Sequence, residues 1–140
     1  MADAEPFVHR LRPRYAEVDQ QGVVFNAHWL TYFDDACTRW FEWLGFQPVT
    51  AFFEDFDLML VKATLEWHGP AGFDDPVDIV VAPVRLGSAS FDVRYAASVS
   101  GRPACTGIVT YVSVKPREGS STPIPEPLRA KLEKVLAPES

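Results

Sequence analysis

The spacing of apolar residues divides the chain into a first strand, one long helix and a run of further strands. From residue 7 to residue 15 the side chains alternate, with Phe7, Leu11 and Tyr15 on one face and arginines on the other. This period of two is typical of a half-exposed strand. Pro13 lacks the N–H that a central strand needs, so we expect this strand at an edge or a bulge.

Between residues 27 and 44 the period changes to that of a helix, with apolar residues at spacings of three and four and polar residues on the other face. Asn26 has a side chain that typically caps a helix N-terminus, and Gly45 fits the left-handed residue that ends many helices. We therefore predict a thickly apolar amphipathic helix over 27–44. Its large rings include those of Trp29, Trp40, Phe41 and Trp43, and most of them are expected in the core.

The rest of the chain predicts mainly strands. A connecting segment that contains Pro48 and the letters FFEDFD leads to alternating runs at 58–68, 77–85, 90–99 and 104–115, with short turns between the last three. A proline-rich link then precedes a short helix over 128–136, which we expect to be a solvated surface cap. The order of elements predicts an α+β domain in which an antiparallel sheet of about five strands curls around the long helix.

Composition limits the class of protein. A chain of 140 residues that is 47% hydrophobic suits a single domain over 1–140, because it can bury a core of its own. The net charge of -6 disfavours a nucleic-acid surface, and charged residues interrupt every apolar run that could cross a membrane. The first ten residues lack the pattern of a signal peptide, which predicts a cytoplasmic protein. Cys37 and Cys105 do not have the spacing of a metal site and are expected as buried free thiols.

One stretch carries a family resemblance. The letters RPRYAEVDQQGVVFNAHWLTYFDDACTRWFEWLG, residues 12–45, resemble the N-terminal signature of the hotdog-fold acyl-CoA thioesterases of the 4-hydroxybenzoyl-CoA thioesterase family. The signature is an aromatic residue, two acids, a glycine, two β-branched residues and an aromatic residue, followed by a helix that ends in Leu-Gly. The resemblance continues less specifically through VRLGSASFDVRY and IPEPLRAKL. It implies a hotdog fold, a long central helix and hydrolysis of an acyl-CoA to the free acid and coenzyme A.

The resemblance gives Asp19 the central chemical role. In such enzymes a carboxylate at this position acts on the thioester carbonyl, as a nucleophile or as a general base that activates water, and the sequence does not separate these routes. The helix N-terminus supplies unpaired amides for the oxyanion, and the backbone amide of Asn26 is the expected donor. Gly22 would allow a tight turn between the carboxylate and that donor. Without its neighbours, an Asp-x-x-Gly sequence is usually only a turn.

Other polar residues are weaker site candidates. Many short-chain members of the family have a histidine where this chain has Asn26, whereas here His28 lies two residues later; both a catalytic role and a packing role are open for it. Glu17 could raise the pKa of Asp19 by repulsion, but we expect it to be a solvated acid. His9 and His68 are expected to be structural.

The substrate is expected to contribute the coenzyme A itself, so no separate cofactor and no metal are predicted. Ser88 and Ser90 match the turn and strand that lie near the acyl or pantetheine part in relatives. Some relatives place basic residues at the turn 87–89, where this chain has none. Arg85 and Arg94 are the nearest cations in sequence and Lys62 is another option, so these are the candidates for holding the phosphates.

Three matters stay open at this point. The exposed edges of a five-stranded sheet predict a homodimer, and two dimers could form a homotetramer. The acyl group could be short aliphatic or aromatic, and it could be linked to coenzyme A or to a carrier protein. Two other kinds of protein fit the same fold, a non-catalytic acyl-binding protein and a hotdog hydratase or dehydratase; the second would normally pair a histidine with an acid near the helix.

Overall fold

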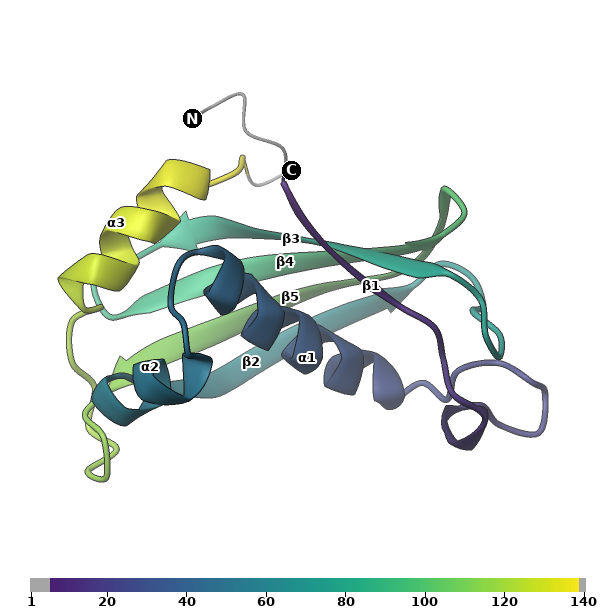
Figure 1. The fold of residues 1–140 in the computed structure, drawn as a ribbon, viewed down its shortest axis with the longest axis horizontal. Coiled ribbons are helices and arrows are strands. Elements are labelled where there is room, and N and C mark those ends of the chain that lie inside the picture. Colours follow the sequence, from purple (N-terminus) through teal and green to yellow (C-terminus); the bar gives the residue numbers. More distant parts are fainter. Residues whose placement is uncertain (1–5, 139–140) are drawn as a thin grey trace.

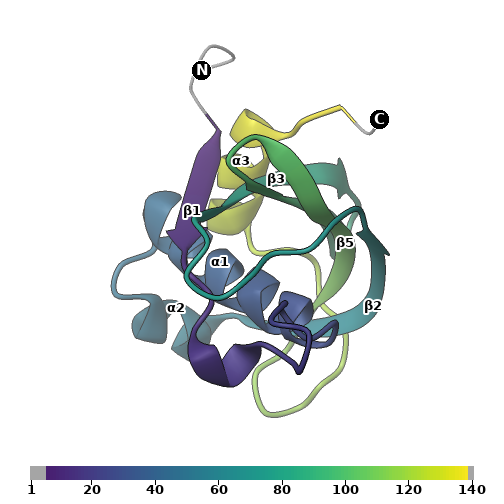
Figure 2. The ribbon, with the colours of Figure 1, turned by 90° about the vertical axis from the view of Figure 1, so that its right-hand side faces the viewer.

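A computed structural model describes residues 6–138, apart from the side chains of residues 53 and 55. It contains one antiparallel sheet of five strands in the order β1-β3-β4-β5-β2. The strands are β1 (Phe7–Leu11), β2 (Asp57–Trp67), β3 (Val77–Leu86), β4 (Ser90–Val99) and β5 (Arg102–Val114). The sheet curls around the long helix α1 (His28–Trp43), which lies along its concave side (Figures 1 and 2). The predicted α+β hotdog fold is thus confirmed.

The central strands follow the alternation of the sequence closely. Along β4 every second side chain from Phe91 to Val99 is buried, and the residues between them are half-buried. β3 and β5 pair with β4 on either side, so these three strands form the middle of the sheet. β1 and β2 are its edges, as expected for the strand that ends before Pro13.

The apolar face of α1 supplies much of the core. Its buried residues recur every three or four positions and are Trp29, Tyr32, Phe33, Ala36, Cys37, Trp40 and Phe41. The ring of Phe33 stacks on that of Tyr95 in β4, with the ring centroids 5.0 Å apart. Gly107 in β5 leaves room for Phe33, since a Cβ at this position would lie 2.8 Å from a Phe33 ring carbon. A large ring of the helix thus packs against the sheet where the strand has no side chain.

Two helices flank this core, and the sequence reading was incomplete for both. The segment after Pro48, expected as a connection only, contains the helix α2 (Val49–Asp55). The C-terminal helix α3 (Glu126–Val135) begins two residues earlier than predicted and packs on β3. Its description as a solvated cap was half wrong, because Leu128 and Leu132 are fully buried. Helices this short gain their stability from such packing, which sequence propensity does not report.

Further differences concern ends of elements. β1 ends at Leu11, and the predicted extension to residue 15 is replaced by a buried Pro13 and a 3₁₀ turn over Tyr15–Glu17. The expected capping by Asn26 was wrong, because Ala27 is the N-cap of α1 and no side chain caps this end. Trp43, expected near the core, is 44% exposed.

Both cysteines, Cys37 and Cys105, are buried free thiols, as predicted. Among the described residues, none of the helices combines the length and the apolar character that crossing a membrane requires.

Gly107→Ala should destabilise the protein by about 1–3 kcal/mol, because the added methyl group meets the Phe33 ring inside a packed core. Urea unfolding measures the loss. The double variant Gly107→Ala with Phe33→Leu should lose less stability than the sum of the two single variants, since the smaller side chain relieves the contact. A strictly additive loss in the double variant would show that the two residues are not coupled.

Candidate active site

The loop between β1 and α1 forms a small hairpin that carries Asp19 at its tip. The N–H of Phe25 donates to the carbonyl of Glu17 at 3.1 Å, and the N–H of Asp19 donates to the carbonyl of Val23 at 2.9 Å. An isolated bridge pairs Val18 with Val24 between these two contacts. The hairpin therefore ends next to the first turn of α1.

The Asp19 carboxylate is exposed and oriented by its own loop. Its Oδ1 accepts the backbone N–H of Gln21 at 2.8 Å and that of Val23 at 3.4 Å. Within the described part of the chain, Oδ2 accepts no hydrogen bond and Asp19 forms no ion pair. One carboxylate oxygen is thus fixed and the other is available to a reactant.

Gly22 makes the turn of this hairpin possible. Its φ of +78° lies in the left-handed region that favours glycine, and its N–H donates to the Asp19 carbonyl at 2.9 Å. A second loop supports the hairpin, because the N–H of Val24 donates to the carbonyl of Ala71 at 2.8 Å and Val23 forms a bridge with Gly72. Asp19 therefore lies on a loop that is held both by its own turn and by hydrogen bonds to the loop around Ala71.

The start of α1 presents backbone donors at the foot of this hairpin. The N–H groups of Asn26 and Ala27 donate no hydrogen bond to any described residue, whereas the N–H of His28 donates to the Phe25 carbonyl at 2.9 Å. Unpaired amides and the positive end of the helix dipole both favour negative charge here. This end of the helix can therefore stabilise an oxyanion.

His28 is half-buried beside the hairpin. Its ring packs edge-on against Phe25, with the ring centres 6.0 Å apart. Among the described residues, its ring makes no hydrogen bond or ion pair with a carboxylate. The structure thus gives His28 a packing contact and no acidic partner.

Glu17 is not the solvated acid that we expected. Its side chain is 14% exposed. Its Oε1 accepts the Arg14 N–H at 2.8 Å and the Tyr32 hydroxyl at 2.9 Å, and its Oε2 accepts the Arg14 guanidinium at 3.0 Å. Burial acts to raise the pKa of Glu17, but these hydrogen bonds outweigh burial and bring the pKa below its ordinary value. Because Tyr32 belongs to α1, Glu17 ties the Asp19 hairpin to the helix.

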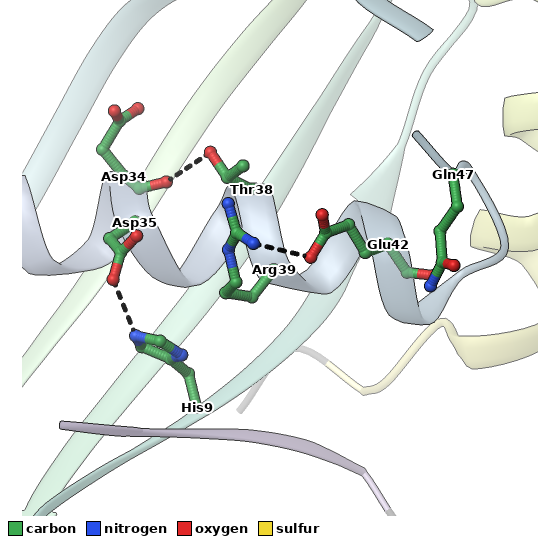
Figure 3. Close-up of polar contacts among 7 residues, drawn as sticks. All are labelled: His9, Asp34, Asp35, Thr38, Arg39, Glu42 and Gln47. Atoms are coloured by element: carbon green, nitrogen blue, oxygen red, sulfur yellow. Dashed lines mark hydrogen bonds and ion pairs between the residues drawn. The ribbon is translucent and has the colours of Figure 1, made fainter. Parts of the chain in front are cut away.

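The two other histidines lie away from the hairpin. His9, for which the sequence offered no partner, has its Nε2 2.9 Å from Asp35 Oδ2, on the side of α1 that faces β1 (Figure 3). His68 follows β2 and has its Nε2 3.0 Å from the Thr106 hydroxyl. Asp35 lies about 13 Å along the helix axis from Asn26, by the rise of 1.5 Å per residue. The His9–Asp35 pair is thus remote from the helix N-terminus.

Three of the predicted substrate-binding residues meet on the outer face of the sheet. Arg85 binds both carboxylate oxygens of Asp92, at 2.9 and 3.1 Å, and also donates to the Ser90 hydroxyl at 2.9 Å. Lys62 lies in register with Thr110, which donates to Asp92 at 2.7 Å. Burial acts to raise the pKa of Asp92, but these hydrogen bonds and the two cations lower it overall. Lys62, Arg85 and Ser90 therefore form one polar cluster around a carboxylate that the sequence reading did not include.

The fourth of these residues, Ser88, lies in the turn between β3 and β4. Arg129 of α3 donates to the carbonyls of Gly87 and Ser88, so a cation does approach this turn. Sequence reasoning missed Arg129 because it lies about forty residues away along the chain and reaches the turn only through packing of α3.

Asp19 and the Ser88 turn are at opposite ends of the sheet. The β1–α1 loop lies at the right in Figure 1, whereas the β3–β4 turn lies at the left beside α3. Between them run strands of about ten residues, each spanning roughly 30 Å. Within one chain, the structure therefore separates Asp19, Gly22, Asn26 and His28 from the other candidates.

Comparison with known proteins agrees with this class of fold. The family model described as the Thioesterase-like superfamily matches residues 13–132. The structure of a thioesterase-superfamily protein from Jannaschia sp. CCS1 is 20% identical and covers 98% of this chain and 97% of its own, with a TM-score of 0.89. The chain has the hotdog fold, and it belongs to the Thioesterase-like superfamily. Membership of this family supports thioester hydrolysis as its general chemistry.

Two further solved structures are similar. A gentisyl-coenzyme A thioesterase is 25% identical and covers 90% of this chain and 99% of its own, with a TM-score of 0.81. A thioesterase from Thermus thermophilus, solved with coenzyme A and zinc, is 23% identical and covers 91% of this chain and 92% of its own, with a TM-score of 0.80. Among the described residues of this chain, no group of three or more His, Cys, Asp or Glu side chains is placed to hold a metal.

Glu17→Gln should destabilise the protein by about 1–3 kcal/mol at neutral pH, because an amide cannot accept all the hydrogen bonds that converge on the carboxylate. The pKa of Glu17 is lower in the folded protein than its ordinary value of 4.5. Its stabilisation is therefore present above that value and disappears as pH falls through the folded pKa. Urea unfolding should show a difference between native protein and variant that shrinks from about pH 6 to about pH 3.

Glu118→Gln, which changes an exposed carboxylate in a turn, is the matched control and should leave stability within about 0.5 kcal/mol. A pH-independent difference for Glu17→Gln would contradict a role for the Glu17 charge.

Proposed function

We propose that this protein hydrolyses an acyl-CoA thioester to the free acid and coenzyme A, with Asp19 as the group that acts on the carbonyl. The observation that carries the proposal is an exposed carboxylate held by loop amides, with one oxygen that accepts no hydrogen bond from a described residue, in the same loop as the Asn26 and Ala27 N–H groups, which donate to no described residue just before α1. The similarity to a gentisyl-coenzyme A thioesterase supports a coenzyme A thioester as the substrate.

Two routes use the same geometry. In the first, Asp19 Oδ2 attacks the carbonyl carbon, the carbon–sulfur bond breaks, coenzyme A leaves as the thiolate, and water then hydrolyses the mixed anhydride. In the second, Asp19 removes a proton from water as the water attacks the carbonyl carbon, and coenzyme A leaves in the same way. In both, the negative charge develops on the carbonyl oxygen, where the backbone N–H of Asn26 would donate.

The positions of the remaining candidates favour a site shared between two copies. A single chain holds Arg85, Ser88 and Ser90 at the β3–β4 turn, the opposite end of the sheet from the Asp19 loop, and it holds Lys62 in the middle of β2. If these residues and Arg129 hold the phosphates, a second copy would bring them near the first copy's Asp19. The free edge of β2 is a suitable surface for that contact, because it exposes Met59, Leu60, Val61 and Trp67.

The proposal includes a homodimer, with a homotetramer as an extension, and a cytoplasmic protein that needs no separate cofactor or metal. A hydratase or dehydratase is less favoured, because His28 has no acidic partner among the described residues and the His9–Asp35 pair lies far from the helix start. A non-catalytic acyl-binding protein remains the alternative, and turnover separates it from the enzyme.

Asp19→Asn should reduce thiol release from acyl-CoA by at least about a hundredfold, because the neutral amide can neither attack the carbonyl nor accept a proton from water. The assay uses short-chain, long-chain and aromatic acyl-CoA substrates, at equal folding and oligomeric state. The best substrate identifies the acyl class.

Asp74→Asn is the matched control, since Asp74 is an exposed loop carboxylate whose backbone N–H donates to the Pro13 carbonyl, between β1 and the Asp19 hairpin. Its φ of +63° is one that asparagine tolerates, so activity should remain near the native rate. Activity that survives in Asp19→Asn would refute the chemical role of Asp19. Binding of acyl-CoA without any thiol release by native protein would favour the binding alternative.

Val61→Lys should shift the protein toward the monomer, because it places a charge on the exposed edge of β2 without disturbing a buried position. Sedimentation velocity measures the change, and thiol release should fall with the dimer fraction if two copies share the site. Leu136→Lys, at an equally exposed apolar position away from that edge, should leave assembly unchanged. An unaltered sedimentation profile for Val61→Lys would argue against assembly through β2.

A further inference from the structure

Glu17 is bonded to two separate points of the segment that contains the candidate site. Its carbonyl accepts the N–H of Phe25 at 3.1 Å, and its carboxylate accepts the Tyr32 hydroxyl at 2.9 Å. Phe25 directly precedes Asn26, and Tyr32 lies in the second turn of α1. The predicted site residues around Asp19 and the helix start all lie between positions 17 and 32. One residue therefore closes the loop that contains them.

The two strands of the hairpin are held by different contacts. The returning strand is fixed to a second loop, since the N–H of Val24 donates to the Ala71 carbonyl at 2.8 Å. The outgoing strand carries Glu17 and Asp19. Among the described residues, the one hydrogen bond from this strand to α1 joins Glu17 to Tyr32. Without that bond, the strand of Asp19 would be joined to the helix start only through its partner strand.

This bond is enclosed, and its acceptor is prearranged. Tyr32 is 5% exposed, and its ring packs edge-on against Trp29 with the centroids 5.6 Å apart. Burial and the contact with Glu17 raise the pKa of Tyr32 above its ordinary value, so the hydroxyl keeps the proton that it donates. Arg14 holds the same carboxylate through its backbone N–H at 2.8 Å and its guanidinium at 3.0 Å. A bond to a charged acceptor held in this way is stronger than one between neutral groups.

We propose that Glu17 and Tyr32 are positioning residues, whose hydrogen bond holds the strand of Asp19 against α1 and so sets the carboxylate relative to the backbone N–H of Asn26. The inference rests on the proposed acyl-CoA hydrolysis. Both routes through Asp19 need the carboxylate and the oxyanion donor at one carbonyl group at the same time. A displacement of about 1 Å between such groups can cost about a hundredfold in rate. Glu17 and Tyr32 act through Asp19 and need no contact with the substrate.

Tyr32→Phe removes the hydroxyl and keeps the ring, so it tests this bond alone. At equal concentrations of folded protein, kcat for thiol release should fall by about tenfold to a hundredfold. KM should stay nearly unchanged, because the bond affects the reacting groups and not the binding of coenzyme A. A purely structural role would lower the amount of folded enzyme and leave the kcat of the folded molecules as it is. An unchanged kcat in folded Tyr32→Phe would overturn the inference.

Tyr95→Phe is the matched control, because it removes a buried tyrosine hydroxyl away from the hairpin. The Tyr95 hydroxyl in β4 lies 2.7 Å from the Tyr111 hydroxyl in β5. Its loss should lower the free energy of unfolding as the loss of the Tyr32 hydroxyl does, and it should leave the kcat of folded protein near the native value. An equal fall in kcat in both variants would show that any lost core hydrogen bond has this effect, which would refute the positioning role.

Two substitutions of Glu17 separate its hydrogen bond from its charge. In Glu17→Gln the amide oxygen can take the place of Oε1 and accept from Tyr32 and from the Arg14 N–H, while the charge facing the guanidinium is lost. Glu17→Leu offers no acceptor at all. Glu17→Gln should therefore keep most of the native kcat despite its lower stability, whereas Glu17→Leu should lose as much kcat as Tyr32→Phe. A lower kcat in Glu17→Gln than in Tyr32→Phe would contradict the assignment to this bond.

Amide hydrogen exchange followed by NMR tests the link without turnover. In Tyr32→Phe the N–H groups of Asp19 and Phe25, which donate across the hairpin, should exchange at least about tenfold faster than in native protein. The N–H of Val24, which the other loop holds, should change less. Unchanged exchange at Asp19 and Phe25 would overturn the inference. If native protein hydrolyses no acyl-CoA but these two amides are selectively faster in the variant, the proposed hydrolysis fails while the link that holds Asp19 stands.

Discussion

The close contact between α1 and the concave face of the sheet is the constraint on which the rest of the structure depends. The stacked rings of Phe33 and Tyr95, with Gly107 beneath them, set how near the helix lies to the strands. This contact fixes the helix axis, and just before the same helix lie the backbone N–H groups of Asn26 and Ala27, which donate to no described residue. Core packing and site geometry are therefore not independent, because both follow from the position of one helix on one sheet.

The sequence predicted those parts of the fold that have a local periodic pattern of apolar and polar residues. The long helix and the four later strands appear within two residues of their expected ends, because each has a clear buried face. α2 was missed because its seven residues are too few to display a period, and Pro48 and the acidic residues suggested a loop. The cap at Asn26 failed for a different reason, since the hairpin held by Glu17 and Phe25 already determines how the chain enters α1.

The family signature indicated which residues form the candidate site, but it did not indicate the contacts that join them to other elements. Nothing in the spacing of Glu17 and Tyr32 indicates that a carboxylate in a loop and a hydroxyl on a helix will meet. Arg129 and the Ser88 turn, and likewise Cys37, Tyr95 and Tyr111, come together only when separate elements pack. Residues in one loop or one helix turn were thus accessible to sequence reasoning, whereas contacts across the core depended on the tertiary structure.

The register shift in β2 between Leu60 and Lys62 has a consequence for how copies of this chain can meet. On either side of it, Leu58, Ala63 and Leu65 pack on the core, so the extra residue keeps the charged side chain of Lys62 on the outside. It also interrupts the ladder that the free edge offers, since a bulge bends and twists a strand. A partner strand can follow this edge only over a short length, which favours a closed pair of molecules over unlimited sheet extension into fibres.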